Sequence, residues 1–205
     1  MEFLKKNNMR EEILKLKPES IFDVIPKEFF LEVGTHHDEY LKCGNYYEYY
    51  YGISKYYQPE TILEIGVRYG YSLGSMIIGS DNVKKVVGID CDDYVSNSLN
   101  VAEENIKKHV TKNLDYTFLN IDSHTINKFD EKYDLIHVDG DHTYDGKIKD
   151  LNLLKNSCKV AIIDDYIHLP QVRDAANDWI EENSTIISKV YLLDSIRGSL
   201  IIEFM

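Results

Sequence analysis

Short apolar runs alternate with helical patterns over most of the chain after Tyr57. Runs rich in β-branched and other apolar residues occupy 61–66, 85–90, 115–121, 133–139 and 159–164. Between these runs, apolar residues in 95–110 and 172–180 recur at the spacing of one helical face. Strands that alternate with helices need crossover connections, which favour parallel pairing and cover both faces of the sheet. The pattern therefore predicts an α/β fold with a doubly wound, mostly parallel sheet.

The carboxyl-terminal part departs from this alternation. Its two β-like runs, 185–194 and 198–205, are joined by the short turn SIRG, with no helical pattern between them. Two strands joined in this way form a hairpin, so one of them must run antiparallel to the rest of the sheet.

The amino-terminal part is rich in tyrosine, with seven tyrosines between Tyr46 and Tyr57. One helical face of this tract carries Tyr46, Tyr50, Ile53 and Tyr57. That face favours packing against the sheet, whereas the other tyrosines are placed to line the mouth of a substrate site. We expect residues 1–57 to form a small helical extension, as a substrate lid or a packing segment, and residues 58–205 to form the main domain.

Composition and charge narrow the classes of partner. With 205 residues, of which 43% are hydrophobic and 28% charged, the chain suits one ordinary globular domain. A net charge of −12 argues against a nucleic acid or an anionic membrane as partner. No apolar stretch is long enough to span a bilayer, and the charged amino terminus lacks the apolar run of a signal peptide.

The cysteines and the first histidines do not predict a metal site. Cys43, Cys91 and Cys158 are odd in number and unclustered, which argues against a disulfide framework or a zinc knuckle. The segment His-His-Asp-Glu at 36–39 lacks ligand spacing, and we interpret it as a solvated turn. A reducing cytoplasm is therefore the expected location.

The turn after the first strand carries glycines at a spacing that suits a ligand. Gly66 and Gly70 let the backbone approach a bound molecule, and the following helix offers free N–H groups to an anion. The spacing from Gly66 to Ser72 differs from the dinucleotide fingerprint G-x-G-x-x-G, which argues against a dehydrogenase. Glu64 is an acid inside an apolar strand, and we favour a ligand-binding role for it over a strand-edge charge.

Acids close the second and third strands as well. Asp90 ends the second strand, where a carboxylate can accept hydrogen bonds from both ribose hydroxyls of an adenosine group. Capping of the next helix is the alternative role. Asp122 follows the third strand and is placed to accept from an adenine amino group, although Asp-Ser after a strand is also ordinary turn chemistry.

The fourth and fifth strands end on Asp139 and on the pair Asp164 and Asp165. Because the carboxyl ends of neighbouring strands converge on one crevice, we expect these carboxylates to meet. Three carboxylates without cysteine suit Mg²⁺, and without a cation their repulsion would raise at least one pKa. His142, three residues after Asp139, is placed to act as a base beside the metal. Helix capping by the acids and a surface role for His142 are the alternatives.

These segments resemble those of a known enzyme class. ILEIGVRYGYS (62–72) is similar to motif I of class I S-adenosylmethionine-dependent methyltransferases, and VVGID (86–90) to their acidic second-strand motif. VDGDHTYDGKIKDL (138–151) followed by AIIDDY (161–166) is similar to the methyltransferase domain 24 family. Relatives in that family include metal-dependent sugar O-methyltransferases from macrolide and aminocoumarin pathways. The resemblance extends over about 60–205.

The resemblance implies a Rossmann-like sheet of seven strands with an inserted antiparallel last strand. It also implies a role for each matching residue. Those that would surround the methionine part of the donor are Glu64, Gly66, Gly70 and Ser72. Asp90 would bind the ribose and Asp122 the adenine. The matching positions for Mg²⁺ are Asp139, Asp164 and Asp165, with His142 as the catalytic base. The tyrosine-rich segment matches no motif, so the resemblance does not name the acceptor.

Residues and resemblance together predict an S-adenosylmethionine-dependent methyltransferase. We expect it to O-methylate a small hydroxylated acceptor, such as a sugar or glycoside, with Mg²⁺ lowering the pKa of the hydroxyl group. A metal-independent small-molecule methyltransferase and a non-catalytic nucleotide-binding protein on the same fold are the alternatives. The expected partner is a small molecule, with no nucleic acid and no membrane, and a homo-oligomer is left open.

Overall fold

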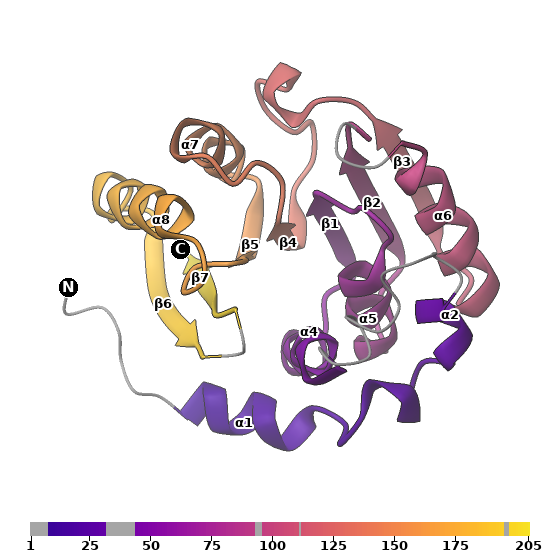
Figure 1. The fold of residues 1–205 in the computed structure, drawn as a ribbon. Helices are drawn as coiled ribbons and strands as arrows, with labels where there is room; N and C mark the ends of the chain where they lie inside the picture. Colours follow the sequence, from indigo (N-terminus) through magenta and orange to yellow (C-terminus); the bar gives the residue numbers. More distant parts are fainter. Residues whose placement is uncertain (1–7, 32–43, 93–95, 111, 195–196) are drawn as a thin grey trace.

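The computed structural model of the chain describes residues 8–31, 44–92, 96–110, 112–194 and 197–205. In these residues a sheet of seven strands forms the centre of the molecule (Figure 1). The strands are β1 (Thr61–Ile65), β2 (Lys85–Asp90), β3 (Asp115–Asn120), β4 (Tyr133–Val138), β5 (Cys158–Ile163), β6 (Ile187–Leu193) and β7 (Ser199–Phe204). Their spatial order is β3-β2-β1-β4-β5-β7-β6.

The strand directions confirm the predicted fold. Neighbouring strands from β3 to β5 pair in parallel, whereas β7 pairs antiparallel with both β5 and β6. The last strand is therefore inserted between β5 and β6, as the resemblance implied. This is the Rossmann-like fold of class I methyltransferases. The predicted hairpin at the end of the chain is the β6–β7 pair.

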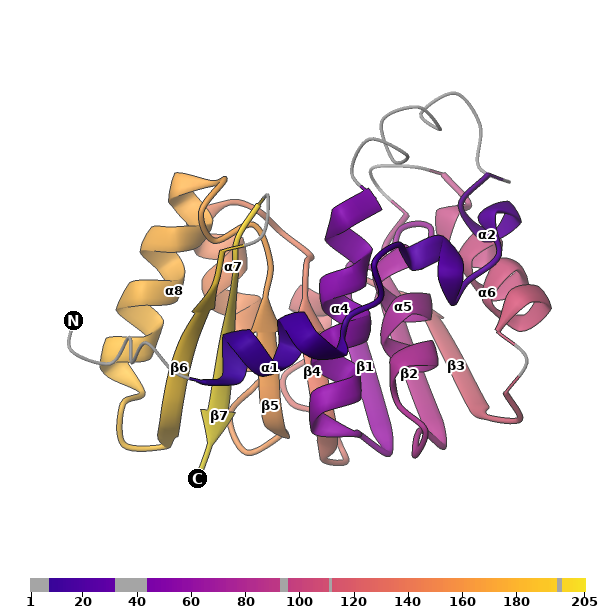
Figure 2. The same cartoon turned by 90° about the horizontal axis from the view of Figure 1, so that it is seen from below.

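Helices cover both faces of the sheet (Figures 1 and 2). One face carries α1 (Asn8–Leu16), α2 (Lys27–Leu31), α4 (Gly44–Tyr57), α5 (Tyr71–Gly79) and α6 (Ser98–His109). The other face carries α7 (Tyr144–Asn152) and α8 (Pro170–Glu182). Two short 3₁₀ turns, η1 (Ile21–Asp23) and η3 (Ser123–Thr125), complete the described elements.

Alternating side chains along the strands build the two cores. Ile62 in β1 and Ile162 in β5 contribute to the core under α4 and α5, whereas their neighbours Leu63 and Ile163 contribute to the core under α7 and α8. Successive residues of a strand point to opposite faces, so near-continuous apolar runs are what a doubly covered sheet requires.

The amino-terminal helices pack on the same core as the sheet. Tyr50 and Ile53 of α4 are buried together with residues of α5, and α1 lies across α4 (Figure 2). Segment 36–39, Cys43 and the start of the predicted pattern 95–110 lie outside the described residues. Within the described part of the chain, no helix has the length and apolar character needed to cross a bilayer.

The carboxyl ends of the central strands lie at one edge of the sheet. Ile65 of β1 is level with Ile89 of β2 and with Val138 of β4, and Val138 is level with Ile163 of β5. The chain leaves β1 towards β2 and β3 and then returns to β4 on the other side. A crevice opens where the strand order reverses in this way, and the residues that follow each strand line it.

Candidate active site

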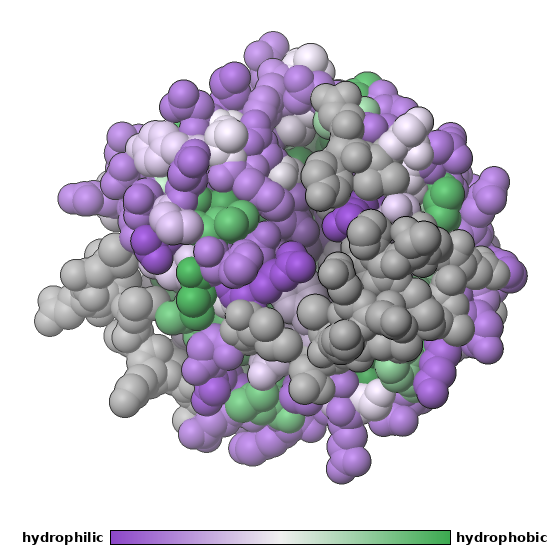
Figure 3. Space-filling view, in the orientation of Figure 1, coloured by the Kyte–Doolittle hydropathy of each residue, from purple (hydrophilic) through white to green (hydrophobic). Residues whose placement is uncertain are grey.

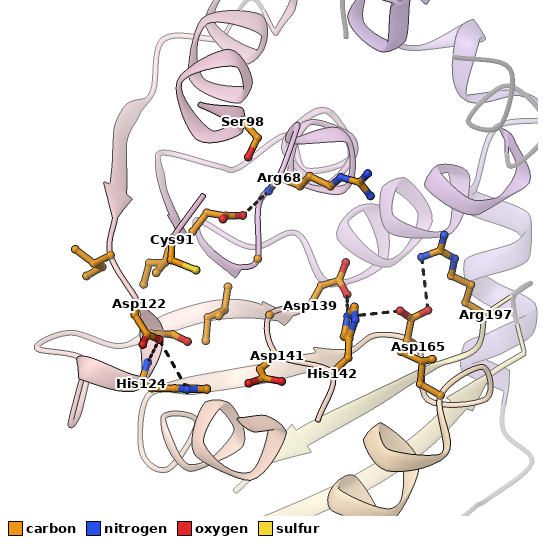
Figure 4. A pocket seen from close by; sticks show the side chains of 18 of the residues that line it. Arg68, Cys91, Ser98, Asp122, His124, Asp139, Asp141, His142, Asp165 and Arg197 are labelled. Atoms are coloured by element: carbon orange, nitrogen blue, oxygen red, sulfur yellow. Dashed lines mark hydrogen bonds and ion pairs between the residues drawn. The ribbon is translucent and has the colours of Figure 1, made fainter. Parts of the chain in front are cut away.

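A cavity of about 640 Å³ lies at this edge of the sheet. Figure 3 shows hydrophilic side chains around the hollow of this face, and Figure 4 shows the residues that line it. Six predicted site residues are among those that line the cavity: Gly66, Asp90, Asp122, Asp139, His142 and Asp165. The structure thus places residues from five separate segments of the chain around one cavity.

The loop after β1 depends on its glycines. Gly66 has a φ of +86°, and a Cβ atom there would lie 2.2 Å from the carbonyl oxygen of Asp139. Only glycine fits a position that combines a left-handed backbone with such a close approach. Gly70, at +77°, begins α5, whose first turn contains Ser72. The loop therefore brings backbone to the cavity wall, and the first residues of α5 line a smaller cavity beside it.

Glu64 lies beneath this loop instead of on the cavity wall. Its side chain is fully buried, and its Oε1 atom accepts a hydrogen bond of 2.5 Å from the Ser72 hydroxyl. The same oxygen lies 2.5 Å from Nδ1 of His137, a buried residue of β4. Burial raises the pKa of Glu64, and the contacts with His137 and Ser72 oppose that rise. Any role of Glu64 thus depends on its buried partner His137. The sequence pattern does not single out His137, because this residue lies within an apolar run.

Asp90 is held at the end of β2 by backbone groups. Its Oδ2 atom accepts from the N–H of Arg68 at 2.7 Å, and its Oδ1 atom accepts from the N–H of Asp92 at 2.9 Å. The N-cap position of α6 is Asn97, and the carboxylate that accepts from the start of the helix is Asp92, whose Oδ1 accepts from the Ser98 hydroxyl and from the N–H of Leu99, each at 2.9 Å. A carboxylate oxygen has more than one lone pair, so Asp90 keeps acceptor capacity towards the cavity.

Asp122 makes the predicted turn contact and also lies at the cavity. It lines the cavity, and its Oδ1 atom also accepts from the N–H of His124 at 2.8 Å, which caps the η3 turn. In Figure 4 it lies with Cys91 at the opposite end of the cavity from His142 and Asp165. The cavity therefore has two chemically different ends.

The second end is formed by Asp139, His142 and Asp165. The Nε2 atom of His142 lies 3.2 Å from Oδ1 of Asp139 and 3.6 Å from Oδ2 of Asp165. One ligand atom from each of the three residues falls within 4.8 Å of the other two. These residues come from the end of β4, the loop before α7 and the end of β5, and the geometry suits a small cation.

The three groups differ in how their surroundings shift their pKa values. Burial acts on Asp139 most strongly and would raise its pKa, but the hydrogen bond with His142 and nearby positive charges bring the pKa below its usual value. That hydrogen bond in turn raises the pKa of His142. Burial and the charge of Asp139 raise the pKa of Asp165, against the opposing effect of Arg197. The imidazole of His142 therefore holds a proton more readily than a free histidine does.

Asp164 lies apart from this group. Its carboxyl group is buried and accepts hydrogen bonds from the hydroxyl of Tyr46 and from Ser199, the latter at 3.2 Å. Burial, and next the charge of Asp165, raise the pKa of Asp164 to about 7. The predicted trio of acids thus has two members at the cavity and one that contacts α4 and β7.

Arg68 and Arg197 also line the cavity, and Tyr46 and Tyr47 line a smaller cavity beside it. The sequence pattern puts Tyr46 on the helical face that packs against the sheet and the tyrosines off that face at a substrate mouth, and no sequence signal assigns Tyr46 to Asp164. The sequence predicts only that Arg197 belongs to a turn between two strands. Its place in the site follows from the insertion of β7 next to β5, which brings that turn beside Asp165.

Comparison with known proteins agrees with this architecture. The sequence matches the family described as a methyltransferase domain over residues 63–166, just over half of the chain. No curated protein matches the chain in sequence. The chain is similar in structure to the S-adenosylhomocysteine (SAH)-bound methyltransferase PaMTH1 of Podospora anserina. The two are 16% identical with a TM-score of 0.66, over 92% of this chain and 88% of that one.

Two O-methyltransferases are similar as well. The enzyme from Bacillus cereus, in complex with SAH, is 18% identical with a TM-score of 0.56, over 100% of this chain and 94% of that one. TomG from Streptomyces achromogenes, involved in tomaymycin synthesis and in complex with S-adenosylmethionine, is 13% identical with a TM-score of 0.59, over 100% and 92%. At these identities the structures show a shared fold, and the sequence match shows the family. The chain therefore belongs to the methyltransferase domain 24 family and is a class I S-adenosylmethionine-dependent methyltransferase.

Proposed function

We propose that the enzyme transfers the methyl group of S-adenosylmethionine to a hydroxyl oxygen of a small acceptor, such as a sugar or glycoside, with assistance from Mg²⁺. The observation that carries this proposal is the meeting of Asp139, His142 and Asp165 at one end of the cavity. A base beside two carboxylates is what deprotonation of a hydroxyl next to a cation requires. The similarity in structure to two O-methyltransferases, one of them involved in tomaymycin synthesis, supports the same class of reaction.

Residues outside this group of three fit the adenosine and methionine parts of the donor. Asp90 offers carboxylate oxygens to ribose hydroxyls, and Asp122 offers an acceptor to the adenine amino group. Gly66 brings backbone to the cavity where any side chain would collide with Asp139. Glu64 retains a buried oxygen, Oε2, with no hydrogen-bond partner among the described residues, so it is a candidate to act on the donor's ammonium group with Ser72.

The carboxylates fit Mg²⁺ in number and chemistry. Asp139 and Asp165 supply oxygen ligands, and Asp165 Oδ1 is buried without a hydrogen-bond partner among the described residues. Asp164 would become the third ligand if its carboxylate exchanged the Tyr46 hydroxyl for the cation. S-adenosylmethionine supplies a methyl group already activated by its sulfonium, and Mg²⁺ supplies positive charge that lowers the pKa of a hydroxyl.

The protein's own contribution is to bind, orient and deprotonate the acceptor. His142 accepts the hydroxyl proton, and Asp139 and Asp165 stabilise the imidazolium that results. Holding the hydroxyl in place accounts for much of the rate increase in a reaction whose methyl group is already activated. This role for His142 agrees with the direction of its pKa shift.

A metal-independent methyltransferase is the second candidate. It is favoured by two contacts that the acids make without an ion: the ion pair of Arg197 Nη1 with Asp165 Oδ1 at 3.7 Å, and the hydrogen bond from Tyr46 to Asp164. In that case the base would act alone, and the acceptor would be a more acidic hydroxyl group or an amine.

A direct test separates these candidates. Methyl transfer from labelled S-adenosylmethionine to a panel of sugars, glycosides and phenols is measured with Mg²⁺, with Mn²⁺ and with EDTA. Mn²⁺ binding is followed in parallel by electron paramagnetic resonance on the wild type and on Asp165→Asn. Activity that disappears in EDTA and Mn²⁺ binding that is lost in Asp165→Asn support the metal. Full activity in EDTA supports the second candidate, and binding of SAH without any transfer to the panel supports a non-catalytic protein.

A further inference from the structure

Two arginine side chains lie where two cavities meet. The main cavity adjoins a smaller one of about 60 Å³, and both are lined by Gly66, Arg68, Asp139 and Arg197. Arg68 comes from the loop after β1, and Arg197 comes from the turn before β7. In Figure 4 both guanidinium groups are directed to the same side of Asp139. Segments that are far apart in the sequence therefore contribute two cations to one wall.

Each arginine lies against an aromatic ring. The guanidinium of Arg68 lies 5.3 Å from the ring centre of Tyr69, and that of Arg197 lies 5.4 Å from the ring centre of Tyr46. Arg68 has a φ of +48°, a left-handed conformation that is costly for a residue with a side chain. Its N–H is fixed by Asp90, so the fold retains this conformation at the edge of the cavity.

Two positive charges at one site are unusual for this acidic chain and this cavity. The chain has a net charge of −12 and only four arginines, and two of the four lie here. The remaining charged lining of the main cavity is dominated by carboxylates, which would repel an anion: Asp90, Asp122, Asp139, Asp141 and Asp165. Arg197 is 3.7 Å from Asp165, longer than a hydrogen bond, so that ion pair leaves its donors available. Guanidinium groups are well suited to binding a carboxylate through two parallel hydrogen bonds.

We infer that Arg68 and Arg197 form a carboxylate-binding subsite, which takes the α-carboxylate of the methyl donor. The inference rests on the proposed donor site. The small cavity is also lined by Gly66 and Ser72, from the loop proposed to surround the methionine part. Its volume suits a carboxylate better than a sugar ring. A carboxylate on the acceptor is the other source of the same chemistry.

The test compares two thioethers that differ in one group. SAH carries both the carboxylate and the ammonium, whereas 5′-(3-aminopropylthio)-5′-deoxyadenosine keeps the ammonium and lacks the carboxylate. Calorimetry on the wild type, Arg68→Gln and Arg197→Gln gives the affinity ratio of the two thioethers for each protein. We expect the wild type to prefer SAH by about tenfold or more, and each variant to lose most of that preference while binding the amine as before.

Two further variants control the experiment. Arg173→Gln removes a partly exposed arginine on α8, away from both cavities, and should leave the ratio unchanged. Arg68→Lys and Arg197→Lys keep the charge and should recover part of the preference, because an ammonium still attracts a carboxylate but cannot bind it in the same two-point geometry. Circular dichroism melts establish that every variant is folded.

The outcomes are distinguishable. A wild type that binds neither thioether overturns the donor site and the inference with it. An unchanged ratio in both folded glutamine variants overturns assignment to the donor. In that case 4-hydroxybenzoate and phenol are compared on the SAH-loaded enzyme. Binding of 4-hydroxybenzoate that requires the arginines assigns the subsite to the acceptor, and no dependence on the arginines overturns the subsite altogether.

Discussion

The hydroxyl of Tyr46 donates a hydrogen bond to the buried carboxyl group of Asp164, 118 residues away in the sequence. Tyr46 also accepts a hydrogen bond of 2.8 Å from the hydroxyl of Tyr50, one turn further along α4. The start of α4 is thereby connected to the end of β5, beside the acids of the cavity. This connection has a measurable consequence for stability.

Stability of the metal-free protein should fall as the pH rises from about 5 to about 7. The pKa of Asp164 is raised to about 7, so the folded state binds a proton that the unfolded state has already released in this range. Stability therefore decreases with pH between the two pKa values and is constant above the higher one. Urea unfolding in EDTA at several pH values measures this decrease in the free energy of unfolding. The contribution of Asp164 to its slope should be at most about 1.4 kcal/mol per pH unit, which is a few kcal/mol in total over this range. Asp164→Asn should have a shallower slope, because Asp165 and Glu64, whose pKa values are also raised, still contribute to it. A variant with the same slope as the wild type would assign the whole effect to other groups.

Replacement of His142 by alanine should slow methyl transfer by about 10²–10⁴-fold, the effect of losing a general base. Binding of SAH and Mn²⁺ should persist. Since the contact with Asp139 raises the pKa of His142, its neutral, proton-accepting form becomes dominant in the metal-free enzyme at a higher pH than in a free histidine. The rate of the wild type should therefore rise with pH, with a midpoint that moves down as bound cation repels the proton. Single-turnover rates between pH 5.5 and 9 measure this limb.

His168→Ala, from the same cavity wall, is the control, and a near wild-type rate in His142→Ala would leave His142 without a catalytic role.

Asp90 and Asp92 should differ in what they contribute. Asp90→Ala should weaken SAH binding by roughly tenfold to a hundredfold, because hydrogen bonds to a charged acceptor contribute about 1.5–3 kcal/mol. Asp92→Ala removes the side chain that caps α6 and should lower stability by about 1 kcal/mol with a much smaller effect on SAH affinity. Calorimetry and thermal melts on both variants make the comparison. The assignment of the ribose to Asp90 fails if the two variants bind SAH equally well.

Lys147→Met should increase the affinity of the site for Mn²⁺ by roughly tenfold, an electrostatic change of about 1.4 kcal/mol. Lys147 is fully buried on α7, its Nζ atom lies 3.4 Å from the carbonyl oxygen of Val138, and Asp139 and Asp165 are among the acids that act on its charge. A cation next to these acids competes with a bound metal ion, and methionine keeps its volume without the charge. Lys149→Met, exposed on the same helix, controls for the substitution. Unchanged affinity in a folded Lys147→Met protein would show that the ammonium does not oppose the metal.

The strands were predictable because apolar runs and their separation encode the doubly covered sheet directly. The convergence of Asp139 and Asp165 could likewise be expected, since residues that follow neighbouring parallel strands meet at one edge. What could not be predicted was which way each carboxylate turns. Asp164 and Asp165 are adjacent in the sequence, yet one contacts Tyr46 and the other faces the cavity, where its backbone has a left-handed φ of +57°.

Arg197 and His137 show a second limit of the sequence pattern. Arg197 enters the site only because β7 is inserted beside β5, and a turn residue carries no local mark of that pairing. His137 occupies an apolar strand and is recognisable only through its contact with Glu64 on the neighbouring strand. Contacts of this kind depend on register and side-chain orientation, which one-dimensional periodicity does not specify.

The close approach of Gly66 to Asp139 joins the donor loop to the proposed metal ligand with no room for even a methyl group between them. A shift of either segment must therefore displace the other. We expect the donor and the cation to bind cooperatively or antagonistically instead of independently. Thermodynamic linkage then requires that the factor by which SAH changes the dissociation constant of Mn²⁺ equals the factor by which Mn²⁺ changes that of SAH. Such a reciprocal pair of titrations would make the contact between these two residues visible as a single coupling constant.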